Sequence, residues 1–137
     1  MTLIDQLFDL WQDPVEGRLD AYADFAEIYC DPVIVNGDQM ALADLVVRAR
    51  TLQGALAGLK ADILQVVEGD SSLAIAFVMR GRHTGDYASP FGPVPATGRE
   101  VAIRTIDVLT LTDGRISRIW VNADDLGLLR QLGAISG

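Results

Sequence analysis

The sequence is short of the residues that build covalently linked or metal-held scaffolds. It contains one cysteine, Cys30, and one histidine, His83. A single thiol excludes an internal disulfide, and one Cys with one His cannot supply a Cys/His zinc site. No loop has the ligand spacing of a carboxylate calcium site. We therefore predict no metal site, and the lone cysteine fits a cytoplasmic location.

Long apolar runs and excess positive charge are also missing. No stretch reaches the roughly 18 apolar residues of a membrane span, and Asp5 and Asp9 stand where a signal peptide would be positive and then apolar. The net charge of −8 disfavours nucleic acid or an anionic membrane as a partner. The 137 residues, 50% of them hydrophobic, predict a single domain over residues 1–137.

The periodicity of apolar residues changes from helical to strand-like along the chain. Helical spacing occurs in residues 3–12, 18–29 and 40–56, with a short strand expected at 33–35. The later segments are expected to be strands at 60–68 and 72–84, a Gly- and Pro-rich loop at 85–98, two strands from residue 101, and a helical turn at 125–133. Helices followed by one antiparallel sheet predict an α+β fold in which the helices cover one face of a curved sheet.

Asp113-Gly114 joins the last two strands and is a strong signal for a tight hairpin turn. A two-residue loop here pairs positions whose numbers sum to 227. Side chains alternate along strands, so one face is predicted to carry Ile103, Thr105, Asp107, Trp120, Asn122 and Asp124. Buried unpaired carboxylates are costly, which favours a cavity on this face, polar at its floor and apolar at its walls. A β-bulge in the hairpin would move residues to the opposite face.

The carboxylates of this hairpin are candidates for acid/base chemistry. Asp124 would act as a base near neutral pH if apolar neighbours such as Trp120 and Phe77 raised its pKa from about 3.9 by roughly two units. It would alternatively cap the following helical turn, a role that Asp125 fills equally well. Asp107 is a candidate for the site or for an ion pair with a nearby arginine.

Several other side chains are candidates for substrate contacts. Histidine is the residue type whose unperturbed pKa lies near neutrality, and His83 shares the strand parity of Phe77. It is therefore a candidate to line the same cavity, the alternative being a half-exposed position at the strand end. Asn122 is a candidate to hold a substrate oxygen. Tyr87 and Phe91 are expected either to form a mobile mouth or to pack their loop down. Asn36, at a strand end, is a candidate for the site or for its own turn.

The segment Trp120-Val-Asn-Ala-Asp124-Asp-Leu-Gly127-Leu-Leu-Arg-Gln131-Leu-Gly133 resembles the C-terminal signature of the SnoaL-like polyketide cyclases. That family belongs to the nuclear-transport-factor-2-like superfamily, which also includes ketosteroid isomerase. Similar motifs lie upstream, at His83-Thr-Gly85, Pro95-Ala-Thr-Gly98-Arg99 and Ile103-Arg-Thr-Ile-Asp107. The resemblance implies a cone-shaped fold with a deep pocket and a homodimer formed through the sheet.

The resemblance also implies a reaction. The best-known family members close a polyketide ring by intramolecular aldol condensation without metal or cofactor, and their acid/base residue matches Asp124. Asp124 would remove a proton α to a carbonyl group, while Asn122 or His83 held the enolate. The alternatives are an isomerase or hydrolase that uses the same pocket acid, or a non-catalytic dimeric domain that binds an apolar small molecule. Some cyclases also use a histidine near Leu109 or Thr110, and its absence here favours the non-catalytic alternative.

Overall fold

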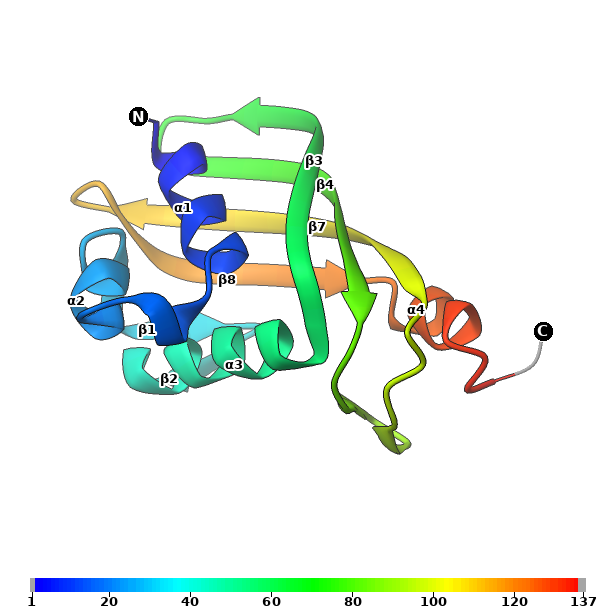
Figure 1. The fold of residues 1–137 in the computed structure, drawn as a ribbon. Coiled ribbons are helices and arrows are strands. Elements are labelled where there is room, and N and C mark those ends of the chain that lie inside the picture. Colours follow the sequence, from blue (N-terminus) through cyan, green and yellow to red (C-terminus); the bar gives the residue numbers. More distant parts are fainter. Residues whose placement is uncertain (1, 136–137) are drawn as a thin grey trace.

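The computed structural model describes residues 2–135, in which helices from the first half of the chain lie against one side of a curved sheet (Figure 1). The helices are α1 (Leu3–Gln12), the short 3-10 helix η1 (Val15–Gly17), α2 (Ala21–Ala26), α3 (Leu42–Ala55) and α4 (Asp125–Gln131). The strands are β1 (Tyr29–Val35), β2 (Asp38–Met40), β3 (Leu56–Glu68), β4 (Ser72–His83), β5 (Tyr87–Ser89), β6 (Gly92–Val94), β7 (Glu100–Thr112) and β8 (Arg115–Ala123). The predicted α+β class is confirmed.

The main sheet has six strands in the order β2-β1-β8-β7-β4-β3. Its neighbours are antiparallel except for β1 and β8, which run parallel, so the predicted all-antiparallel sheet is wrong at this point. These two strands come from distant parts of the chain, and no hairpin fixes their relative direction. A second departure lies at 85–98, where β5 and β6 form a small hairpin in the predicted loop.

Apolar side chains from α1 and α3 pack on the side of the sheet that we call the inner face. Thr2 and Asp5 form a capping box that begins α1, which then buries Leu7 and Phe8 against the strands. Helix α3 contributes Leu45 to the same core. The buried residues of the strands that meet these helices are Ile75, Phe77, Met79, Ile103, Leu109 and Ile119. None of the described helices is long and apolar enough to cross a membrane.

A β-bulge at Ser117 changes the register of the β7–β8 hairpin. The predicted turn is confirmed, with Asp113 and Gly114 at φ values of 52° and 79°. Thr112 pairs with Arg115, as a two-residue loop requires, but Thr110 pairs with Arg118. One extra residue therefore lies in β8, and the Ser117 hydroxyl donates to the carbonyl oxygen of Thr110 at 3.2 Å.

Every residue of β8 after the bulge lies on the face opposite to the predicted one. Asp107 now pairs with Val121, and Ile106 pairs with Asn122. Val121 shares the inner face with Asp107, whereas Trp120 and Asn122 lie on the opposite, outer face. The sequence-based prediction that Asp107, Trp120 and Asn122 share one face is therefore wrong, because the bulge shifts the strand by one residue.

Candidate functional site

A cavity of about 230 Å³ lies between the inner face of the sheet and helices α1 and α3. This volume is slightly below the range of roughly 300–1,000 Å³ that is usual for small-molecule pockets. Most of the lining is aliphatic or aromatic, and Phe77 packs edge-on against Phe8 with ring centroids 4.8 Å apart. The polar or ionisable lining residues are Trp11, Tyr29, Arg48, Tyr87, Thr105, Asp107 and Asp125. The cavity therefore suits a compact, mainly apolar ligand.

Asp107 places a carboxyl group on the inner face of the sheet, where it lines this cavity. Its flanking partners are Ile75 on β4 and Val121 on β8, so both neighbouring strands surround it with hydrocarbon. Its Oδ1 atom is buried and has no hydrogen-bond partner among residues 2–135. Burial raises the pKa of Asp107 from 3.8 to about 7. A carboxyl group with this pKa can both accept and release a proton near neutral pH.

Tyr29 and Trp11 form a buried hydrogen-bonded pair at the wall of the same cavity. The indole Nε1–H of Trp11 donates to the hydroxyl oxygen of Tyr29 at 2.9 Å. Tyr29 is 2% exposed, and its ring stacks on Phe25 with centroids 5.8 Å apart. Burial raises the pKa of Tyr29 above its usual range, and the nearby Asp107 adds to the rise. The phenol therefore stays protonated at neutral pH.

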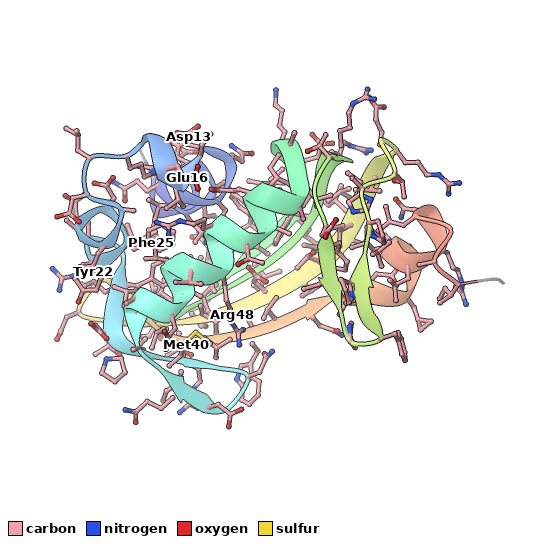
Figure 2. The ribbon with its side chains drawn as sticks, turned by 60° about the horizontal axis from the view of Figure 1, so that its bottom comes forward. Asp13, Glu16, Tyr22, Phe25, Met40 and Arg48 are labelled. Carbon is pink, nitrogen blue, oxygen red and sulfur yellow. The ribbon has the colours of Figure 1, made fainter. Side chains whose placement is uncertain are left out.

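Charged and aromatic side chains gather at the edge of the cavity. Arg48 comes from α3, where Figure 2 shows it beside the strands. The hydroxyl of Tyr87 donates to Asp125 at 3.5 Å, and both residues line the cavity. Tyr87 thus lies where a mouth residue was expected. Phe91, at the tip of the β5–β6 hairpin, is 80% exposed and is not part of the lining.

Asp124 lies at the start of α4 and does not line the cavity. Its Oδ1 accepts the backbone N–H of Gly127 at 2.9 Å, which makes it the N-cap of α4. Its Oδ2 lies 3.1 Å from the guanidinium of Arg104. The Gly127 hydrogen bond, and then that of Arg104, lower the pKa of Asp124. The predicted inward orientation of Asp124 is wrong, and the pKa of Asp124 is lowered, not raised.

Three further predicted contact residues lie away from the cavity. Trp120 is 48% exposed, and Asn122 lies beside it on the outer face. Asn36 has a positive φ of 51° and accepts the backbone N–H of Val121 through Oδ1 at 2.8 Å. It therefore holds the β1–β2 turn against β8, as the turn alternative predicted.

His83 is fully buried but does not line the cavity either. Its Nδ1 accepts the backbone N–H of Thr97 at 3.1 Å and lies 3.0 Å from the Thr97 hydroxyl. His83 therefore fastens the end of β4 to the segment before β7. The prediction that it shares a cavity with Phe77 is wrong, because only the inner-facing residues of β4 as far as Met79 reach the cavity.

Tyr29 and Trp11 line the cavity but were not predicted for the site, whereas Thr105 lines it from the strand face on which it was predicted. Tyr29 was assigned to the end of a helix at 18–29, whereas it begins β1. Trp11 lies in the helix predicted at 3–12 and lines the cavity from α1. Among residues 2–135 there is no group of three or more Asp, Glu, His or Cys side chains placed to hold a metal ion.

A helix-covered, curved sheet around an apolar pocket with a buried carboxyl group defines an α+β domain built around a pocket. The sequence profile described as "SnoaL-like polyketide cyclase" matches residues 4–132, and the chain belongs to this family. Among curated protein sequences, none matches the chain significantly.

Solved structures show the same fold. TsrD from Streptomyces laurentii is 20% identical with a TM-score of 0.81, and the match covers 97% of this chain and 93% of TsrD. IdmH, a putative polyketide cyclase from Streptomyces antibioticus, is 20% identical with a TM-score of 0.76, covering 96% of both chains. A putative SnoaL-like polyketide cyclase from Jannaschia Sp. CCS1 is 14% identical with a TM-score of 0.76, covering 98% of this chain and 93% of the other.

Proposed function

We propose that the protein is a cofactor-independent enzyme that closes a ring in a compact carbonyl substrate of the polyketide type, with Asp107 as general acid and base. The observation that carries the proposal is the Asp107 carboxyl group, which lines an apolar cavity and has a buried oxygen without a partner among residues 2–135. Membership of the SnoaL-like polyketide cyclase family supports the type of reaction.

The reaction divides into two proton transfers around one bond formation. The Asp107 carboxylate removes a proton from a carbon α to a carbonyl group, and the electron pair of the C–H bond passes into an enolate. The enolate carbon attacks a second carbonyl carbon of the same molecule, and the new C–C bond closes the ring. The protonated Asp107 then returns its proton to the alkoxide, so that the product is an isomer of the substrate. The apolar walls fold the chain and bring the two carbons together.

Asp124 is the competing assignment, because the family resemblance places the acid/base role there. Its contacts favour a structural role, since its two carboxylate oxygens are engaged by Gly127 and Arg104. A base with a lowered pKa is also a weak acceptor for a carbon acid. Asp107 and Asp124 can be separated by one experiment, because Asp107 lies on β7 and lines the cavity, whereas Asp124 caps α4 and does not line it.

The experiment compares Asp107→Asn and Asp124→Asn with wild type in a panel of linear β-polyketone esters, analysed by chromatography and mass spectrometry. Asp107→Asn should lower turnover at least a hundredfold, as expected for loss of a general base, while Asp124→Asn retains turnover at temperatures where α4 is folded. Loss of turnover only in Asp124→Asn would return the acid/base role to Asp124. A cyclase gives a ring isomer, an isomerase a shifted double bond, and a hydrolase a product that has gained water.

Dimerisation through the outer face is part of the same proposal. This face exposes large apolar side chains that no other part of residues 2–135 covers, including Ile106 and Trp120. A groove of about 680 Å³ beside them is lined by residues that include Leu64, Ile106 and Leu126. A second copy of the chain would bury these side chains, as the family resemblance implies. The cytoplasmic location stays a prediction from the sequence.

A further inference from the structure

We propose that Tyr29 donates the hydrogen bond that holds the carbonyl oxygen of the substrate, and that Trp11 positions the Tyr29 hydroxyl for this task. The proposal rests in part on the proposed function, since it supplies the enolate-binding group of that reaction. Asn122 and His83, the donors expected from the sequence, do not line the cavity.

The direction of the Trp11–Tyr29 hydrogen bond leaves one hydrogen free. An indole N–H is a donor only, so the Tyr29 oxygen must be the acceptor of the 2.9 Å contact. The phenol hydrogen then needs another acceptor, and the hydroxyl donates to no residue in the range 2–135. Because Tyr29 lines the cavity, a ligand oxygen there is the acceptor that completes this chain of donors.

The Tyr29 ring is held by aromatic neighbours on more than one element. It stacks on Phe25 of α2 with an angle of 15° between the ring planes, and Phe25 in turn packs edge-on against Trp11. Phe25 is completely buried. The hydroxyl is therefore presented by a ring that has little freedom to turn, which is the condition for a preorganised donor.

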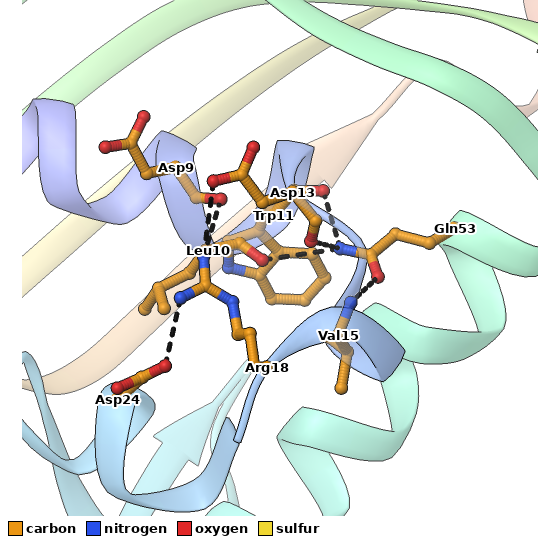
Figure 3. A network of polar contacts seen from close by, with 8 residues as sticks. All are labelled: Asp9, Leu10, Trp11, Asp13, Val15, Arg18, Asp24 and Gln53. Carbon is orange, nitrogen blue, oxygen red and sulfur yellow. Dashed lines mark hydrogen bonds and ion pairs between the residues drawn. The ribbon is translucent and has the colours of Figure 1, made fainter. Parts of the chain in front are cut away.

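The backbone of Trp11 is itself held by Gln53 of α3 (Figure 3). The Gln53 side-chain amide donates to the carbonyl oxygens of Leu10, Trp11 and Asp13, at 3.3, 3.0 and 2.8 Å. Its Oε1 accepts the backbone N–H of Val15 at 2.8 Å. Gln53 thus satisfies carbonyl groups at the C-terminal end of α1. Gln53 also holds the backbone of Trp11, while the indole Nε1–H of Trp11 contacts the Tyr29 hydroxyl.

The electrostatics of the site suit a neutral donor. Burial keeps Tyr29 in its phenol form, so a donor is present throughout the physiological pH range. The aliphatic lining strengthens a hydrogen bond to a developing enolate oxygen. Tyr87 is less available, because its hydroxyl contacts Asp125. Tyr29 and Asp107 therefore divide the work, one holding the carbonyl oxygen and the other moving the proton.

The test measures binding of 2-naphthol, a compact aromatic enol, by its fluorescence. Tyr29→Phe removes only the hydroxyl and should weaken binding roughly three- to tenfold. Trp11→Phe should weaken binding by a smaller factor, and it should have no further effect when combined with Tyr29→Phe, because its influence passes through the hydroxyl. Tyr22→Phe is the matched control, since Tyr22 does not line the cavity and contacts Asp31 instead.

The second measurement is the kinetics of a substrate that the wild type converts. Tyr29→Phe should lower kcat about a hundredfold with a smaller change in KM, as for removal of one oxyanion donor. Equal naphthol binding by wild type and Tyr29→Phe, or no binding to wild type, would overturn the proposal. Additive losses of binding in the Trp11→Phe/Tyr29→Phe double variant would overturn the positioning role of Trp11. Because naphthol binding needs no turnover, the role of Tyr29 is tested even if Asp107 is not the base.

Discussion

Replacing Asp107 by asparagine should remove a pH-dependent loss of folding stability. In the folded protein the pKa of Asp107 is raised from 3.8 to about 7 by burial. Between these two values the unfolded chain releases the proton while the folded protein keeps it. The folded state then binds more protons than the unfolded state, so the free energy of unfolding falls as the pH rises.

The size of this loss follows from the pKa difference. Each pKa unit corresponds to 1.36 kcal/mol, so a shift from 3.8 to about 7 corresponds to about 4 kcal/mol in wild type. The loss begins near pH 4 and is complete above about pH 7. Asparagine carries no titratable group, and Asp107→Asn should therefore gain about this amount on wild type over that interval, as an order of magnitude.

Guanidinium unfolding at intervals from pH 4 to pH 8, followed by tryptophan fluorescence, measures both proteins. The quantity to plot is the difference in unfolding free energy between Asp107→Asn and wild type, because the titration of other groups cancels in it. The difference should rise steadily with pH and level off above about pH 7. A constant difference would refute the reasoning, since it would mean that Asp107 titrates alike in the folded and unfolded states.

Two further predictions concern the outer face and helix α4. Ile106→Asp should convert the dimer to a monomer in light scattering, because it puts a charge among exposed apolar side chains. Thr84→Asp, placed outside the sheet, is the control and should leave the dimer intact. A monomeric wild type would contradict the proposed dimer. Asp124→Ala should lower Tm by a few degrees above pH 5 and have less effect at pH 3, because its lowered pKa makes the charged carboxylate the stabilising form. A Tm deficit that grew on acidification would count against the capping role of Asp124.

Local patterns predicted the elements whose determinants lie within a few residues. Helix α1 has the expected bounds, Leu3–Gln12, because its apolar period is regular and Thr2 caps it. The turn at Asp113-Gly114 is confirmed because these residue types adopt the positive φ values that it needs. Phe77, Tyr87 and Asp107 were predicted for the site and do line the cavity.

The rest of the site could not be predicted, because it depends on contacts between residues far apart in the sequence or on features that do not change the apolar pattern. A strand with one extra residue has no break in its composition, so the bulge at Ser117 is not apparent in the alternation. That one residue moved Trp120 and Asn122 to the outer face. His83 is held by Thr97, which lies in a segment without periodicity. Tyr29 and Trp11 lie 18 residues apart in the sequence and come into contact only in the folded chain.

The bulge at Ser117 has an evolutionary consequence. The two faces of β8 serve different surroundings, one the cavity and the other the outer surface. Loss or gain of a single residue at the bulge would exchange these two sets of side chains without any substitution. A lineage with this fold can therefore change the chemistry of its pocket by one insertion or deletion. Relatives that share a motif in the last strand need not present the same side of it to their ligands.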